Sequence, residues 1–168
     1  MQAIRIAIID DHEVVINGLK AMLSNHDSLN IVFTTTEADV LMTFLKTYGA
    51  DVVLMDIQMP EISGIDLCKM VRRQHEEVKV IAFSSFDDTH YIKQVLRNGA
   101  SGYILKNADQ QTIITAVQTV MEGGEFIDES VKRLLIHESI TGQRRSIYEI
   151  PLTKREKEIL KLIAEDKT

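Results

Sequence analysis

Hydrophobic and polar positions alternate with two different periods along the first 124 residues. Short apolar runs rich in β-branched residues predict strands at 4–9, 29–34, 52–55, 79–83 and 103–105. Between these runs, apolar residues recur three to four positions apart, which is typical of amphipathic helices. The predicted helices span 13–24, 38–48, 64–74 and 88–98, and a fifth runs from 109 to Gly123-Gly124.

Five strands that alternate with five helices predict an α/β fold with a parallel sheet covered on both faces. Right-handed crossovers then favour a doubly wound, flavodoxin-like, five-stranded sheet with the order 2-1-3-4-5. The spacing also predicts which helix positions are buried. It assigns Val14 to the apolar face of the first helix, and Val40 and Tyr48 to that of the second.

The alternation stops after Gly124, which divides the chain into three expected parts. Residues 1–124 form the α/β domain, and 125–151 form a linker that begins with a helix at 128–140. Thr153 and Glu156 then match a capping box before an apolar stripe. Since one amphipathic helix cannot bury its own apolar face, residues 152–168 are expected to begin a second, helical domain that is cut off.

Charge and cysteine content narrow the class of protein. The net charge is −6, but residues 1–131 hold nineteen Asp and Glu against ten Lys and Arg, so this part is a poor nucleic-acid binder. The single cysteine, Cys68, excludes an intrachain disulfide and suggests a reducing compartment. The sequence has no signal peptide pattern and no apolar run that could span a bilayer, so a cytoplasmic protein without membrane contact is expected.

Polar residues with complementary chemistry follow the predicted strands. Asp10 and Asp11 follow the first, Asp56 the third, Ser84 the fourth and Lys106 the fifth. In a doubly wound sheet these positions meet at one crevice. Three carboxylates suit Mg²⁺, a carboxylate can act as a covalent nucleophile, and phosphoryl transfer needs mainly positioning and charge neutralisation. Asp56 is therefore the expected phosphoryl acceptor.

Each of these residues also has an ordinary interpretation when it is taken alone. Acids favour the first turn of a helix, and Ser84 and Lys106 could be surface residues. His12 has no second His or Cys at ligand spacing, so it is interpreted as a local helix-cap residue and not as a zinc ligand. Only the joint occurrence at successive strand ends favours function.

The pattern resembles the receiver domain of two-component response regulators over about residues 3–124. It is carried by Asp10-Asp11, by Asp56 with Met59-Pro60 and Gly64, by Ser84, and by Lys106. The resemblance implies that a histidine kinase phosphorylates Asp56. It implies Mg²⁺ ligands from Asp11, Asp56 and the main-chain carbonyl of Gln58, with Asp10 acting through water. It further implies Lys106 as the phosphate-pairing cation and Ser84 and Tyr103 as switch residues.

The C-terminal segment resembles the first helix of a LuxR-type helix-turn-helix, beginning at Leu152-Thr153-Lys154-Arg155-Glu156. A receiver joined to such a domain is the arrangement of the NarL/FixJ family of transcription factors. The resemblance implies a DNA partner for the full-length protein but not for this chain, which lacks the recognition helix, and a homodimer on phosphorylation.

Two other functions remain open at this stage. A phosphatase of the dehalogenase class also uses an aspartyl nucleophile with Mg²⁺, but it would need an acid where Gln58 stands. A stand-alone receiver would signal through protein contacts only. The expected protein is a response regulator and not an enzyme.

Overall fold

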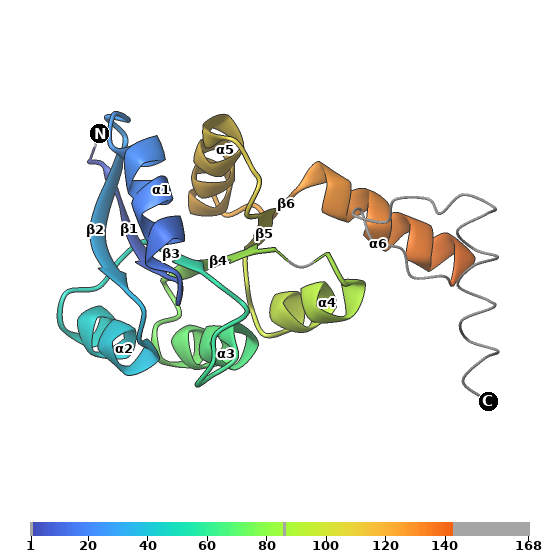
Figure 1. Cartoon of the computed structure of the whole chain (residues 1–168), viewed down its shortest axis with the longest axis horizontal. Helices are drawn as coiled ribbons and strands as arrows, with labels where there is room; N and C mark the ends of the chain where they lie inside the picture. The colour runs from blue at the N-terminus through green and yellow to red at the C-terminus, as the bar shows by residue number, and fades with distance from the viewer. Residues whose placement is uncertain (1, 86, 143–168) are drawn as a thin grey trace, which may run out of the picture.

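The computed structural model describes residues 2–85 and 87–142, and in this part of the chain strands and helices alternate strictly (Figure 1). The strands are β1 (Ile4–Ile9), β2 (Leu29–Thr35), β3 (Val52–Met55), β4 (Lys79–Ser84), β5 (Gly102–Leu105) and β6 (Phe126–Ile127). The helices are α1 (Glu13–Leu23), α2 (Ala38–Thr47), α3 (Gly64–Gln74), α4 (Thr89–Arg97), α5 (Gln110–Met121) and α6 (Glu129–Thr141). The expected interdomain connection after 142 and the helix at 152–168 lie outside the described residues.

All strand pairs are parallel, and the sheet order is β2-β1-β3-β4-β5-β6. The predicted doubly wound order of the first five strands is confirmed. The sixth strand is an addition: Gly102 pairs with Phe126 and Tyr103 with Ile127. A two-residue strand gives no periodic signal in a sequence, because alternation needs about four residues to be visible.

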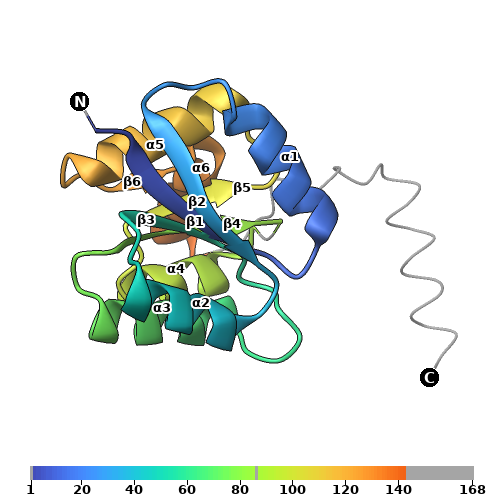
Figure 2. The ribbon, with the colours of Figure 1, turned by 90° about the vertical axis from the view of Figure 1, so that its left-hand side faces the viewer.

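The sheet is sandwiched between two helical layers, which the end view separates clearly (Figure 2). α1 and α5 pack on one face over a cluster that includes Ile8, Leu54 and Ile104. α2, α3 and α4 pack on the other face over a cluster that includes Ala7, Val53 and Tyr103. The central strands are buried on both sides, which explains their continuous apolar runs.

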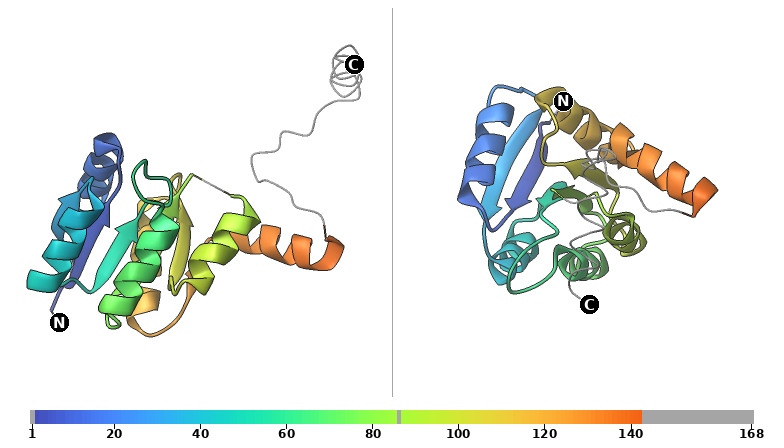
Figure 3. Two further views of the ribbon diagram at one scale, coloured as in Figure 1. Left: turned by 90° about the horizontal axis from the view of Figure 1, so that it is seen from below. Right: turned by 45° about the vertical axis from the view of Figure 1, so that its right-hand side comes forward.

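The segment after Gly124 packs onto this sandwich. β6 extends the sheet, and α6 lies beside α4, as the view from below shows (Figure 3). Val131 is fully buried in the same cluster as Tyr103, and Leu134 is 7% exposed. Lys93 of α4 and Glu138 of α6 form an ion pair of 3.2 Å. The predicted linker helix is thus bound to the α/β domain along its first turns.

Some predicted helix faces are wrong in detail. Val14 is 83% exposed, and Val40 and Tyr48 are 41% and 69% exposed. In α1 the buried positions are Ile16, Leu19 and Leu23, and in α2 they are Leu41 and Leu45. Both helices pack against β2, which is the edge strand of the sheet.

Candidate functional site

Two parallel strands deliver buried carboxylates to the same edge of the sheet. Asp10 follows β1 and is 1% exposed, and Asp56 follows β3 and is 2% exposed. The Asp56 N–H donates to the Ile9 carbonyl at 2.9 Å, so the ladder between β1 and β3 continues to the point where both side chains emerge. The prediction that these acids meet is therefore borne out by the geometry of the strands.

Lys106 supplies the countercharge from β5. The main-chain N–H of Lys106 donates to the Ser84 carbonyl at 2.9 Å, which fixes this part of the backbone beside β4. Its ammonium Nζ lies 2.6 Å from Asp10 Oδ2 and 3.3 Å from Asp56 Oδ2, and the side chain is only 16% exposed. Such a partly desolvated ion pair is much less screened than a surface one.

The environment of Asp56 favours its protonated form in the absence of a cation. Burial raises the pKa of Asp56 from its ordinary value of 3.8 to about 6, and the negative charge of Asp10 adds to the increase. Lys106 and a 3.1 Å hydrogen bond from the Gln58 N–H to Asp56 Oδ1 act in the opposite direction. Removing solvent from a carboxylate is the larger effect here.

Gly64 allows the loop after β3 to fold tightly behind Asp56. A Cβ at this position would lie 2.0 Å from the Asp56 carbonyl oxygen and 2.7 Å from the Ile57 Cα. The Gly64 N–H donates to the Ile57 carbonyl at 2.9 Å, and the Ser63 side chain caps α3 by accepting from the Ile65 N–H. The loop packing therefore requires glycine, because backbone atoms fill the space of any side chain.

Ser84 and Tyr103, the predicted switch pair, are in contact. Both are completely buried, and their hydroxyls share a hydrogen bond. Burial raises the pKa of the Tyr103 phenol above its ordinary range, so the phenol stays neutral. The two residues connect the strand end next to Asp56 with the core beneath α4 and α6.

His12 holds the helix-cap position that the sequence indicated, but its ring makes a contact that the sequence did not predict. It is the N-cap residue of α1, but its side chain makes no capping hydrogen bond. The imidazole Nδ1 instead lies 2.8 Å from Asp11 Oδ1 and 3.3 Å from Asp10 Oδ1. Its adjacency to Asp10-Asp11 was the available signal in the sequence.

The donor atoms of this cluster fit a divalent cation. Asp10 Oδ2, Asp11 Oδ1 and Asp56 Oδ2 are buried oxygens that accept no hydrogen bond among the described residues. One ligand atom each from Asp10, Asp11, His12 and Asp56 can be chosen so that all lie within 4.8 Å of one another. Carboxylate oxygens grouped this closely are what a hard cation such as Mg²⁺ needs.

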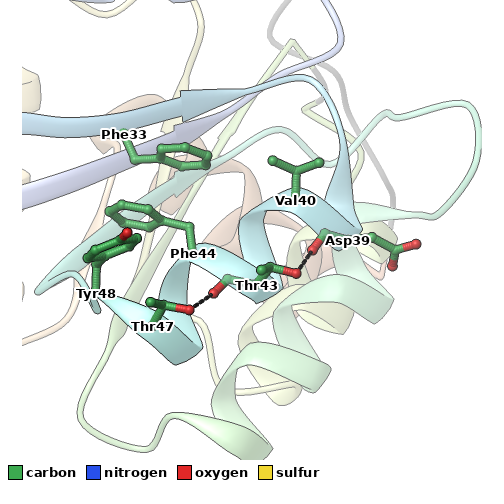
Figure 4. Close-up of a pocket in the computed structure, with 7 residues that line it drawn as sticks. All are labelled: Phe33, Asp39, Val40, Thr43, Phe44, Thr47 and Tyr48. Atoms are coloured by element: carbon green, nitrogen blue, oxygen red, sulfur yellow. Dashed lines mark hydrogen bonds between the residues drawn. The ribbon is translucent and has the colours of Figure 1, made fainter.

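A cavity of about 520 Å³ opens beside the acidic cluster and gives access to it. Asp11, His12, Gln58, Met59 and Tyr91 are among its lining residues. A second pocket, of about 360 Å³, lies between β2 and α2 and shares no lining residue with the first. The rings of Phe33 and Phe44 stack at 4.1 Å there, and Tyr48 tilts against Phe44 (Figure 4). The first cavity is therefore the one next to reactive groups.

No helix within residues 2–85 and 87–142 combines the length and the hydropathy that a membrane crossing requires.

Comparison with known proteins gives consistent matches. Residues 6–118 match the family model described as the response regulator receiver domain. The chain is 34% identical to the transcriptional regulatory protein DegU of Brevibacillus brevis, over 96% of this chain and 75% of that protein. Relatives of this kind are regulators and not enzymes.

Two solved structures are similar in fold. The isolated receiver domain of RcsB from Salmonella enterica serovar Typhimurium, determined with the phosphomimetic BeF₃⁻, has a TM-score of 0.73 and 25% identity. The match covers 79% of this chain and 98% of that one. A structure of two RcsB dimers bound to two parallel DNAs has a TM-score of 0.75 and 26% identity, over 98% of this chain and 78% of that one.

Proposed function

The chain belongs to the response regulator receiver family, and from this premise we propose that Asp56 accepts a phosphoryl group from a histidine kinase and thereby controls transcription. The observation that carries the proposal is the convergence of Asp10, Asp56 and Lys106 at the carboxyl ends of β1, β3 and β5. A buried carboxylate beside an ammonium group and a cation site has the charges that phosphoryl transfer requires.

The covalent step is a displacement at phosphorus. An Asp56 carboxylate oxygen attacks the phosphorus of a phosphohistidine, a P–O bond forms, and the P–N bond breaks. The imidazole nitrogen of the kinase keeps the electron pair of that bond and takes up a proton. The Gln58 N–H holds Asp56 Oδ1 at 3.1 Å, which orients the carboxylate toward the crevice.

The acidic cluster would hold Mg²⁺ through Asp11, Asp56 and the main-chain carbonyl of Gln58, with Asp10 acting through water. The close grouping of ligand atoms from Asp10, Asp11 and Asp56 supports this assignment. When bound, the cation neutralises the charge of the phosphoryl oxygens and of the acids around them. Lys106 pairs with a further phosphoryl oxygen once it leaves Asp10 Oδ2, which is now 2.6 Å away.

The conformational response would start at Ser84, whose hydroxyl turns toward the phosphoryl group. Since Tyr103 shares a hydrogen bond with Ser84, the phenol loses or changes this partner when Ser84 moves. Phosphorylation then shifts the populations of two receiver conformations by the difference in free energy of these contacts.

The domain organisation proposed is a receiver at 1–124, a helical linker at 125–151 and the first helix of a LuxR-type helix-turn-helix at 152–168. The full-length protein would work in the cytoplasm, dimerise on phosphorylation and bind DNA through that second domain. The fold likeness to RcsB, which forms dimers on DNA, supports this arrangement.

Mass spectrometry of the intact protein tests the phospho-acceptor. With Mg²⁺ and an acyl phosphate donor, the wild-type chain should gain one phosphoryl mass and Asp56→Asn should gain none. Asp66→Asn is a matched control, because Asp66 is an exposed acid in the first turn of α3. Equal labelling of wild type and Asp56→Asn would reject Asp56 as the acceptor.

A further inference from the structure

The imidazole of His12 lies at the metal-binding edge of the site and not at the helix terminus that it precedes. Four other helices have N-cap side chains that accept a main-chain N–H, namely Ser63, Asp88, Asp109 and Asp128. His12 makes no such bond, although its backbone has the extended conformation of a cap residue. A capping role therefore does not explain where its ring lies.

The contact between His12 and Asp11 is short but is not a hydrogen bond. Nδ1 lies 2.8 Å from Asp11 Oδ1, yet this buried oxygen accepts no hydrogen bond among the described residues. The ring nitrogen is instead hydrogen-bonded to Asp10 Oδ1 at 3.3 Å. Asp11 Oδ1 thus has the His12 nitrogen beside it without a hydrogen bond between them.

These spacings are those of neighbouring ligands on one ion. With bonds of about 2.1 Å at right angles, adjacent ligand atoms of an octahedral cation are about 3 Å apart. The distances from Nδ1 to the oxygens of Asp11 and Asp10 are 2.8 and 3.3 Å. One ring nitrogen of His12 also belongs to the group of four donor atoms that lie within 4.8 Å of one another.

We propose that His12 Nδ1 is a ligand for first-row transition cations, so that this receiver site binds Mn²⁺ and its heavier neighbours through nitrogen and oxygen. Affinity for a site that contains imidazole nitrogen rises along the series from Mn²⁺ to the later first-row metals, whereas Mg²⁺ prefers oxygen ligands alone. His12 then sets the selectivity of the site among divalent cations. The inference rests on the metal site of the proposed function and adds one residue and one class of metal to it.

The ligating form of His12 is the neutral ring with its proton on Nε2. The side chain is 65% exposed, so this proton can be donated to solvent while Nδ1 faces the acids. Metal binding exchanges the 3.3 Å hydrogen bond to Asp10 Oδ1 for a coordinate bond. Lys106 stays on the opposite oxygen, Asp10 Oδ2, and leaves the His12 side of the site clear.

Pulsed electron paramagnetic resonance of the Mn²⁺-loaded wild-type chain tests the ligand directly. A directly bound imidazole gives a ¹⁴N modulation that changes to the ¹⁵N pattern when histidine is labelled. His12→Ala should abolish this modulation. His75→Ala, which alters the C-terminal end of α3, should keep it.

Calorimetric titrations supply the second readout, which does not depend on phosphorylation. His12→Ala should weaken Mn²⁺ binding about tenfold or more, while the affinity for Mg²⁺ should change less than about twofold. Three results would each overturn the inference. They are a wild-type Mn²⁺ spectrum without nitrogen modulation, a wild-type chain that does not bind Mn²⁺, and an equal loss of Mn²⁺ and Mg²⁺ affinity in His12→Ala. The phospho-acceptor assignment is tested by a different experiment, the Mg²⁺-dependent labelling of Asp56. The two can therefore fail independently.

Discussion

The main-chain carbonyl of Tyr103 accepts a 2.9 Å hydrogen bond from the N–H of Asp128, the residue that caps α6. Asp128 Oδ1 in turn accepts from the N–H and the hydroxyl of Ser130 at 3.0 and 2.6 Å. The residue that contacts Ser84 through its side chain is thus joined to the linker helix through its backbone. A shift of β5 therefore has a direct route to α6.

The packing of α6 should contribute measurably to the free energy of unfolding of the described domain. Val131→Ala removes two methyl groups from a fully buried site that it shares with Tyr103, so the free energy of unfolding should fall by about 2 kcal/mol. Ile136→Ala is the matched control, because Ile136 is 58% exposed on the same helix and should cost less than about 0.5 kcal/mol. Urea denaturation of both variants measures their free energies of unfolding. A similar loss of stability in the two variants would show that α6 is not anchored through Val131.

The sheet and most of the acidic cluster could be predicted because each depends on local signals. A buried parallel strand must be apolar throughout, so Val52–Met55 ends visibly at Asp56. Crossover handedness then places the ends of neighbouring strands together. The positions of Asp10, Asp56 and Lys106 follow from these two rules.

Features that depend on tertiary packing could not be predicted in the same way. Val14 fits the apolar period of α1 but is 83% exposed, because periodicity does not show which positions a neighbouring element covers. Phe126–Ile127 is too short to give a period. The contact between the His12 ring and Asp11 depends on backbone and side-chain torsions together, which an apolar pattern does not show.

The close approach at Gly64 predicts a large effect of one methyl group. Gly64→Ala places a Cβ 2.0 Å from the Asp56 carbonyl oxygen, so the loop must shift, and the domain should lose about 2 kcal/mol or more. Because that loop also positions the Gln58 N–H, phosphoryl labelling of Asp56 should fall as well.

Gly18→Ala is the control for this substitution. Gly18 lies inside α1 with no atom within 4 Å of its would-be Cβ, so alanine there should stabilise the helix by about 0.5–1 kcal/mol. Thermal denaturation compares the two variants. A Gly64→Ala variant as stable as wild type would show that the loop can move without strain.

The raised pKa of Asp56 predicts that its charge destabilises the metal-free fold. The folded-state pKa of about 6 lies above the ordinary 3.8, so between these values the folded protein binds more protons than the unfolded chain. The stability contributed by Asp56 therefore falls as pH rises from about 4 to 6. In chelator at pH 7, Asp56→Asn should be more stable than wild type, by up to about 3 kcal/mol.

Denaturation at a series of pH values measures this difference. The gap between Asp56→Asn and wild type should widen from pH 4 to pH 6 and then level off. Saturating Mg²⁺ should narrow the gap, because it stabilises the ionised carboxylate of wild type alone. A gap that is independent of pH would mean that the buried Asp56 charge is already compensated in the metal-free state.

Lys106 and a divalent cation compete for the same two carboxylates, which predicts a gain of metal affinity when the lysine is removed. The ammonium lies 2.6 Å from Asp10 and 3.3 Å from Asp56, and it would stand close to a cation bound by these acids. Lys106→Met keeps most of the side-chain length and removes the charge, so Mg²⁺ should bind about five- to tenfold more tightly. Lys93→Met removes a charge that pairs with Glu138 on α6 and should leave the affinity unchanged. Titration calorimetry at low ionic strength gives the Mg²⁺ dissociation constants of both variants. Weaker Mg²⁺ binding by Lys106→Met would show that the lysine organises the acids for the metal instead of competing with it.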